Sequence, residues 1–87
     1  TLAYWRKAAR LGHPGAAHWL SRVYAEGRGV PRDLVRAKMW AELALGSGAL
    51  ADRMHHDRLA ARMTGREIAA AVALVRRCRA SQMEQCG

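Results

Sequence analysis

The residues best suited to bind a metal ion are two adjacent histidines and a nearby aspartate. His55 and His56 are neighbours in the chain, and Asp52 precedes His56 by four residues. Adjacent side chains on a helix diverge by about 100°, so the two histidines cannot hold one ion together, whereas residues four apart share a face. Asp52 and His56 supply two ligands, and nothing in the sequence places a third. We interpret them as a surface ion pair or as an N-terminal helix charge, and we expect no metal site.

Two cysteines lie near the end of the chain, at Cys78 and Cys86. Along a continuous helix this spacing is a rise of about 12 Å, too far for a disulfide unless the tail folds back. Cys78 falls on an apolar stripe beside three arginines that would favour a thiolate. We expect free thiols, with Cys78 buried for structural reasons rather than acting as a nucleophile.

The chain shows no arrangement of residues typical of an active site. Ser21, Ser47 and Ser81 lack the strand-turn-helix context of a nucleophilic serine, and no carboxylate pair is placed for acid–base chemistry. Gly27 and Gly29 lack the third glycine and the preceding strand of a dinucleotide-binding loop, and they fit a turn between helices. We therefore expect no enzymatic activity and no cofactor.

Arginine supplies 13 of the 15 basic residues, and the formal net charge is +8. Such a charge permits a polyanionic partner. No run of like charge exceeds two residues, and acidic residues are interspersed, which is typical of a solvated helical surface. A nucleic-acid or acidic-partner binding module is the alternative function, and its contacts would be Arg53, Arg58, Arg62, Arg66, Arg76, Arg77 and Arg79.

Length and composition limit the chain to a small helical core. Of its 87 residues, 18 are alanine, 15 are leucine, isoleucine or valine, and none is phenylalanine, so the core must be shallow. The abundant alanine, arginine, leucine, methionine and glutamate favour helix, and three tryptophans add large buried surfaces. No run of about 18 apolar residues occurs, so no membrane span is expected. The sequence predicts an all-α fold.

Two neighbouring segments are predicted to form an antiparallel helix pair. Apolar residues recur at intervals of three and four over residues 16–27 and again over residues 34–45. The turn between them contains Gly27, Gly29 and a proline, and it ends at Asp33, which is placed to cap the second helix. Further along the chain, Thr64 and Glu67 have the spacing of a capping box.

An internal repeat links the beginning of the chain to this pair. Trp5 stands 35 positions before Trp40, and Ala9 stands 35 positions before Ala44. The first segment ends at Gly12 and the second at Gly46 and Gly48, where helices often need a left-handed residue. A period of this length is typical of stacked helix pairs.

The helix pair resembles the Sel1-like repeat, a relative of the tetratricopeptide repeat. It has the family's residues at nine pattern positions, which are Ala16, Leu20, Tyr24, Gly27, Gly29, Val30, Asp33, Ala37 and Trp40. Ser21 is a departure, because the family has glycine at this close helix contact. Residues Leu2 to Gly12 look like the second helix of a preceding repeat.

The resemblance implies an α/α solenoid, a right-handed superhelix of antiparallel helix pairs, here with about four helices. Residues 1–12 would be the second helix of a preceding repeat, 13–48 one complete Sel1-like repeat, 49–80 a divergent C-terminal capping helix pair, and 81–87 a polar tail.

The resemblance also implies a protein–protein interaction scaffold, an adaptor in bacterial signalling, envelope or host-interaction complexes. In stacked helix pairs the first helix of each repeat lines the concave face, where residues outside the packing pattern meet the partner. Here these residues are His18, Trp19, Arg22 and Glu26. A tryptophan beside an arginine has the composition of a binding hot spot, although Trp19 could equally pack on an adjoining helix. We assign Trp5, Trp40 and Tyr24 to packing.

An incomplete array leaves an apolar face open at its first helix, so we expect self-association, as a homo-oligomer, through Leu2 to Leu11. The alanine and arginine richness fits a bacterium with a GC-rich genome, while the cytoplasmic and the periplasmic or secreted locations both stay open. Some cysteine-rich Sel1-like proteins are linked to β-lactam hydrolysis, but their regularly spaced cysteine pairs are missing here.

Overall fold

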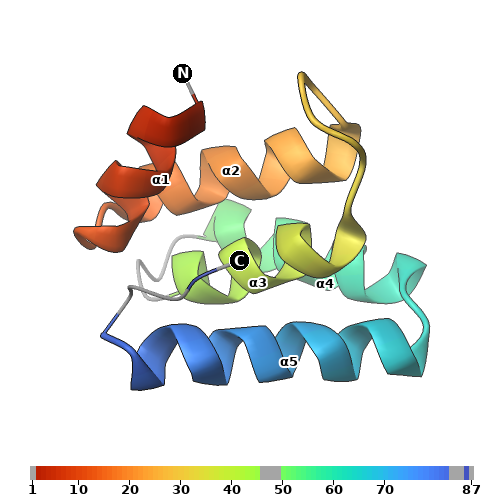
Figure 1. The fold of residues 1–87 in the computed structure, drawn as a ribbon. Coiled ribbons are helices and arrows are strands. Elements are labelled where there is room, and N and C mark those ends of the chain that lie inside the picture. The colour runs from red at the N-terminus through yellow and green to blue at the C-terminus, as the bar shows by residue number, and fades with distance from the viewer. Residues whose placement is uncertain (1, 46–49, 83–85, 87) are drawn as a thin grey trace.

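The chain folds into helices joined by short connections (Figure 1). The structure is a computed structural model that describes residues 2–45, 50–82 and 86. Its helices are α1 (Leu2–Arg10), α2 (Pro14–Glu26), α3 (Leu34–Ala44), α4 (Leu50–Arg62) and α5 (Gly65–Ala80). The all-α class is confirmed for the described residues. They form five helices rather than about four, one in residues 1–12, two in residues 13–48 and two in residues 49–80.

The turn between α2 and α3 follows its sequence signals. Gly27 ends α2 with a left-handed φ of 72°, and its N–H donates to the carbonyl of Val23 at 2.9 Å. A side chain at Gly27 would also crowd the turn, because its Cβ would lie 3.3 Å from the backbone nitrogen of Arg32. Asp33 then caps α3 by accepting a hydrogen bond from the backbone of Arg36 at 3.0 Å. The predicted turn and cap are confirmed.

The start of α5 is fixed by the predicted capping box. The Thr64 hydroxyl accepts from the Glu67 backbone at 3.2 Å, and the Glu67 carboxylate accepts from the Thr64 backbone at 2.9 Å. These two bonds satisfy backbone donors that the first turn of a helix leaves free. The expected helix stops at Gly46 and Gly48 lie outside the described residues.

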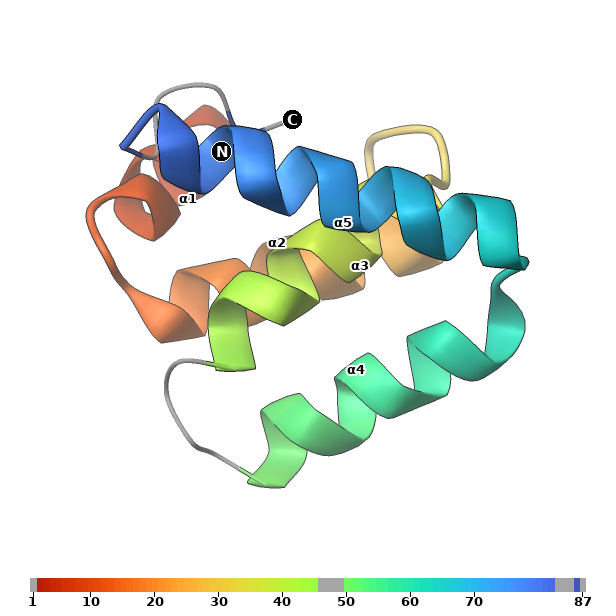
Figure 2. The same ribbon diagram turned by 90° about the horizontal axis from the view of Figure 1, so that it is seen from below.

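Helix α3 is the centre of the packing, because it contacts α2, α4 and α5, while α1 packs on α2. In Figure 2, α4 and α5 flank α3 on two sides. Trp40 and Met39 of α3 and Leu20 of α2 are fully buried, and Tyr24 is nearly so. Small residues are buried around them, namely Ala16, Ala17, Ala37, Ala41 and Ala44. Alanine therefore lets these helices approach closely, which builds a core without phenylalanine.

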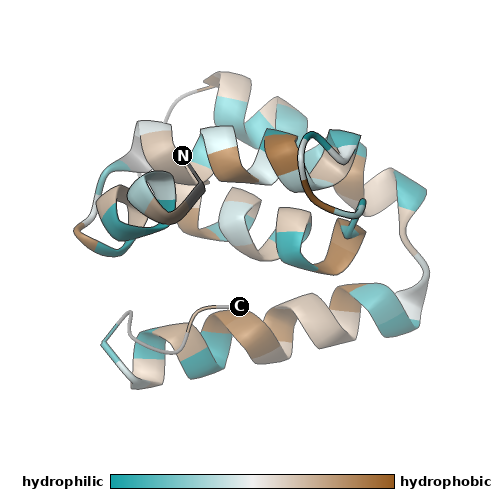
Figure 3. Cartoon of the chain, turned by 45° about the horizontal axis from the view of Figure 1, so that its top comes forward, coloured by the Kyte–Doolittle hydropathy of each residue, from teal (hydrophilic) through white to brown (hydrophobic). Residues whose placement is uncertain are grey.

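Figure 3 shows polar and apolar residues distributed unevenly along the helices, with an apolar stretch over residues 68–75 of α5 and polar residues toward the ends of that helix. In the described part of the chain, no helix is both long enough and apolar enough to cross a membrane. Helix α3 is buried all round over residues 37–41, whereas α5 buries one side, through Ala71, Val75 and Cys78.

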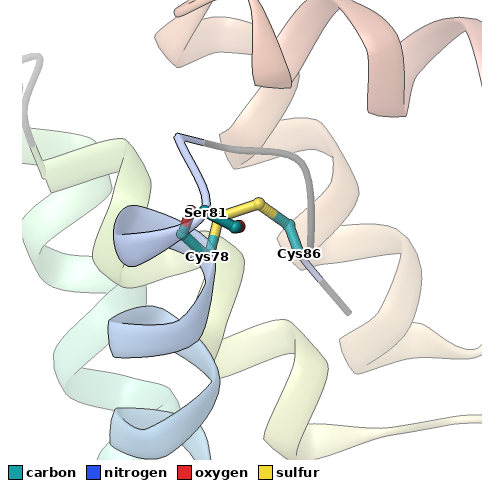
Figure 4. The surroundings of a disulfide bond; sticks show 3 residues. All are labelled: Cys78, Ser81 and Cys86. Atoms are coloured by element: carbon teal, nitrogen blue, oxygen red, sulfur yellow. Dashed lines mark hydrogen bonds between the residues drawn. A yellow bond between two sulfur atoms is a disulfide. The ribbon is translucent and has the colours of Figure 1, made fainter.

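Cys78 and Cys86 form a disulfide (Figure 4), so the prediction of free thiols is wrong. The physical reason is that α5 ends at Ala80 and the chain reverses after it, which brings the two Cα atoms within 4.4 Å. Cys78 is fully buried, as expected, and Cys86 packs against the hydrophobic core. Cys86, which belongs to the segment 81–87 predicted to be a polar tail, is thus bonded to α5, while residues 83–85 and 87 of that segment lie outside the described residues.

Candidate binding groove

A groove with a volume of about 500 Å³ lies between α2 and α4, and we call it the α2–α4 groove. Its α2 wall includes His18, Arg22, Ala25 and Glu26, and its α4 wall includes Met54, His55, Arg58, Leu59 and Arg62. Because α3 separates these helices in the chain, the groove depends on the fold rather than on local sequence.

A second hollow, of about 360 Å³, continues along α2, and its lining includes Gly15, Trp19 and Arg28. His18, Arg22 and Glu26 line both hollows. The structure therefore brings the four predicted partner-binding residues to one face of α2, at the border of two concave surfaces. This placement follows from their spacing of one, three and four residues on a helix.

Trp19 both packs and remains accessible. Its ring centroid lies 5.9 Å from that of Trp5 on α1, with the rings tilted by 51°. Its exposed fraction is still 36%. The two alternatives for this residue are therefore compatible: one edge of the indole supports the α1–α2 contact, and another lines the second hollow.

The charged residues of α2 are held in a chain of ion pairs. Glu26 lies 2.7 Å from Nε of Arg28 and 3.7 Å from a terminal nitrogen of Arg22. All three side chains are substantially exposed, so each pair contributes little to stability. The pairs keep the charged groups at the mouth of the groove and orient the Arg22 guanidinium.

Two histidines and a serine form a polar cluster beside the α2–α4 groove, in which His18 and His55 line the groove and Ser21 is fully buried next to them. His55 Nε2 lies 2.7 Å from the Ser21 hydroxyl, which donates to the Ala37 carbonyl at 2.6 Å. The His55 ring also meets the edge of the His18 ring, with centroids 5.1 Å apart, and His18 Nδ1 lies 2.6 Å from Asp52. This contact with Asp52 is close but does not have the geometry of a hydrogen bond.

Burial lowers the pKa of His55, and the nearby His18 and Arg22 lower it further, whereas Asp52 acts in the opposite direction. His55 is therefore neutral at pH 7. Ser21 is not an activated nucleophile in this arrangement, because it is fully buried and donates its only hydrogen to a backbone carbonyl. The cluster joins α2, α3 and α4.

His56 points to a different set of partners. Its Nε2 lies 2.6 Å from Glu42 and 2.7 Å from Nζ of Lys38, and the Lys38 amine lies 3.0 Å from Glu42. Burial acts to raise the pKa of Glu42, but the hydrogen bonds from Lys38 and His56 outweigh it, and the net pKa is lowered. This cluster attaches α4 to α3 through charged groups, with Lys38 almost completely buried.

The sequence-level pairing of Asp52 with His56 is not formed, because Asp52 meets His18 and His56 meets Glu42. Asp52 is buried, so a surface ion pair is wrong for this residue, but it lies in the first turn of α4, so the alternative of an N-terminal helix charge is confirmed. The divergence of His55 and His56 is confirmed by their separate partners. Within the described ranges, no group of three or more histidine, cysteine or acidic side chains is arranged to hold a metal ion.

The arginines of the nucleic-acid alternative are all exposed but are spread over two helices. Arg58 and Arg62 line the α2–α4 groove, and Arg53 of the same helix does not. The other four belong to α5, and they are Arg66, Arg76, Arg77 and Arg79.

Sequence reasoning missed the polar clusters that attach α4 to its neighbours. Ser21 carried a usable signal, because a hydroxyl at a position where the Sel1-like pattern has glycine must find a partner when buried. Lys38 and Glu42 carried another, since their spacing of four residues allows a helical ion pair. Neither signal identifies His55 or His56 as the partner on α4.

Comparison of the chain with protein-family models, with curated proteins and with solved structures finds no match. The resemblance to Sel1-like repeats therefore stays a prediction from the residue pattern.

Proposed function

We propose that this chain is a protein–protein interaction scaffold built from Sel1-like repeats, and that it binds its partner on the face of α2 that borders the α2–α4 groove. The observation that carries the proposal is the convergence of His18, Trp19, Arg22 and Glu26 on two adjoining hollows. A scaffold needs an accessible concave surface with an aromatic anchor and orientable polar groups, and this face offers both.

The helix contacts support the repeat interpretation. α2 packs against α3, α3 packs against α5, and α2 and α4 line one groove. In a stack of helix pairs, the first helices of successive pairs share one face and the second helices share the other. For α2 and α3 such a pair is formed, whereas α4 and α5 each pack on α3 and make few contacts with each other. The support for a stack is therefore limited to the α2–α3 pair and to the groove that α2 and α4 share.

The composition of the face supports recognition over packing alone. Trp19 is anchored by Trp5 and so presents a rigid apolar surface at low entropic cost. Arg22 and Glu26 lie beside it with exposed charged groups. Tryptophan and arginine are the residues that most often dominate binding energy at protein interfaces.

The test is recovery of partners from the native cell with the chain as bait. We expect Trp19→Ala and Arg22→Ala each to reduce the recovered partner about tenfold or more, while Arg76→Ala on α5 leaves it unchanged. Because Trp19 also packs on Trp5, circular dichroism of each variant must show native helix content, and Arg22→Ala tests the face without touching that contact. Equal recovery with all three variants would remove this face from consideration.

A further inference from the structure

The α2–α4 groove carries an excess of positive charge that its own residues do not neutralise. Arg22 lines the groove from α2, and Arg58 and Arg62 line it from α4. Within the described residues, neither Arg58 nor Arg62 forms an ion pair, and both are exposed. Glu26 is the acidic residue among those lining the groove, so three guanidinium groups face a single carboxylate.

The acidic groups near the groove are already engaged. Glu26 contacts Arg28 at 2.7 Å and Arg22 at 3.7 Å, and Asp52 lies beneath the surface against His18 at 2.6 Å. His55, neutral at pH 7, adds no charge to the groove. The carboxylates of a ligand could therefore pair with Arg58 and Arg62 of α4 without first breaking an ion pair of these arginines within the protein.

The floor of the groove is apolar, which distinguishes it from a purely electrostatic surface. Ala25 and Leu59 are buried beneath it, and Met54 is 46% exposed at its side. Methionine adapts its shape to different side chains. The groove thus combines an apolar strip with flanking cationic side chains. It therefore suits a peptide in which acidic and apolar side chains alternate.

The spacing of the arginines indicates the conformation of such a peptide. Arg58 and Arg62 are four residues apart on one helix face, a separation of about 6 Å along the axis. In an extended chain, alternate side chains point the same way and lie about 6.6–6.8 Å apart. Two acidic residues separated by one residue in an extended peptide therefore match the two guanidinium groups.

We propose that the α2–α4 groove binds an extended acidic peptide, in which two carboxylates two positions apart pair with Arg58 and Arg62 and a neighbouring apolar side chain packs on Met54 and Leu59. Arg22 contacts the same peptide from the opposite wall. This inference rests on the proposed scaffold function and specifies the chemistry of its partner.

The experiment compares three labelled peptides of one length by fluorescence anisotropy at about 150 mM salt. In the first peptide, every second residue is glutamate and the residues between are alanine or leucine. The second peptide has glutamine in place of every glutamate, and the third has lysine. We expect the glutamate peptide to bind the full chain about tenfold more tightly than either of the others. We expect the Arg58→Gln/Arg62→Gln variant to lose about tenfold in affinity.

Because the whole chain is basic, a second variant controls for non-specific attraction. Arg66→Gln/Arg76→Gln removes the same charge from exposed positions of α5, outside the groove, and should change the affinity by less than about threefold. Equal losses in the two double variants would overturn the proposal. So would tighter binding of a single-stranded oligonucleotide that depends on both arginine pairs alike, since that result would favour nucleic acid.

The outcomes also separate this inference from the scaffold function. If the glutamine peptide binds as tightly as the glutamate peptide and Arg22→Ala weakens it, the acidic preference is wrong and the binding face stands. If none of the three peptides binds, the acidic-peptide proposal is wrong, and the scaffold function is judged separately by partner recovery with the Trp19 and Arg22 variants.

Discussion

The hydroxyl of Ser21 joins three helices, because it donates to the Ala37 carbonyl at 2.6 Å and lies 2.7 Å from Nε2 of His55. A hydroxyl has one hydrogen to donate, so Nε2 of His55 must carry the hydrogen of the second bond. The hydrogen bonds that join Ser21, Ala37 and His55 therefore depend on one neutral tautomer of His55.

Ser21→Ala should destabilise the protein by about 1–3 kcal/mol, because it leaves a buried carbonyl and a ring nitrogen without their partner. Urea unfolding followed by circular dichroism measures the change. Combining it with His55→Ala in a double-mutant cycle should reveal a coupling of at least about 0.5 kcal/mol. Strictly additive losses would show that the hydroxyl and the imidazole do not interact.

Stability should fall as the pH drops from about 7.5 to 5.5. The pKa of His55 is lowered from its ordinary value of 6.5, so in this range the unfolded chain takes up a proton that the folded chain does not. His55→Gln keeps a donor near Ser21 but does not titrate, so its unfolding free energy should depend less on pH. Parallel pH profiles for the two proteins would contradict the buried, neutral state of His55.

Glu42 contributes in a separate, more acidic range. Its pKa is lowered from 4.5, so its interactions stabilise the fold above that pH and are lost as the pH falls through the lowered value. Glu42→Gln should therefore flatten the stability profile below about pH 4.5 and leave the slope between pH 7.5 and 5.5 unchanged. Unfolding midpoints measured at pH 3.5, 4.5, 5.5 and 7.5 check the distinction, and an equal effect of Glu42→Gln in both ranges would refute it.

Reduction of the Cys78–Cys86 disulfide should cost about 2–3 kcal/mol, the loss of chain restriction expected for a short closed loop. Urea unfolding with and without dithiothreitol measures it, and the Cys78→Ala/Cys86→Ala variant should not respond to the reductant. If protein purified without reductant has two titratable thiols per chain, the disulfide is wrong and the expectation of free thiols at Cys78 and Cys86 is right.

Self-association through α1 is expected, because Tyr4 and Leu11 are exposed by 67% and 77%. Analytical ultracentrifugation at high micromolar concentration should detect a species larger than the monomer, and Tyr4→Ser/Leu11→Ser should shift it toward the monomer. A single monomeric boundary for the unmodified chain would count against an open apolar end.

The features that were predictable from sequence are those set by nearby residues. Gly27 needs a left-handed backbone, Asp33 and Thr64 cap the helices that follow them, and Trp40 lies on an apolar stripe, so each is readable within one or two turns. The placement of the predicted partner-binding residues on one side of α2 was predictable for the same reason. Helical periodicity alone places them together.

The features that were missed depend on distant segments. Ser21 and His55 are 34 residues apart, and their contact exists only once α4 has packed beside α2 and α3. The disulfide was missed because a helical rise was applied to Cys78 and Cys86 across a point where the helix ends. In both cases tertiary packing, rather than local preference, determines the outcome.

Site-specific photocrosslinking in the native cell tests the central claim most directly. A benzophenone amino acid placed at Trp19 lies at the second hollow, and the same group at the exposed Val72 of α5 is the control. We predict a discrete crosslinked partner from position 19 that Arg22→Ala diminishes, and no such product from position 72. Crosslinking of the same partner from position 72, with none from position 19, would contradict the assignment of the binding face.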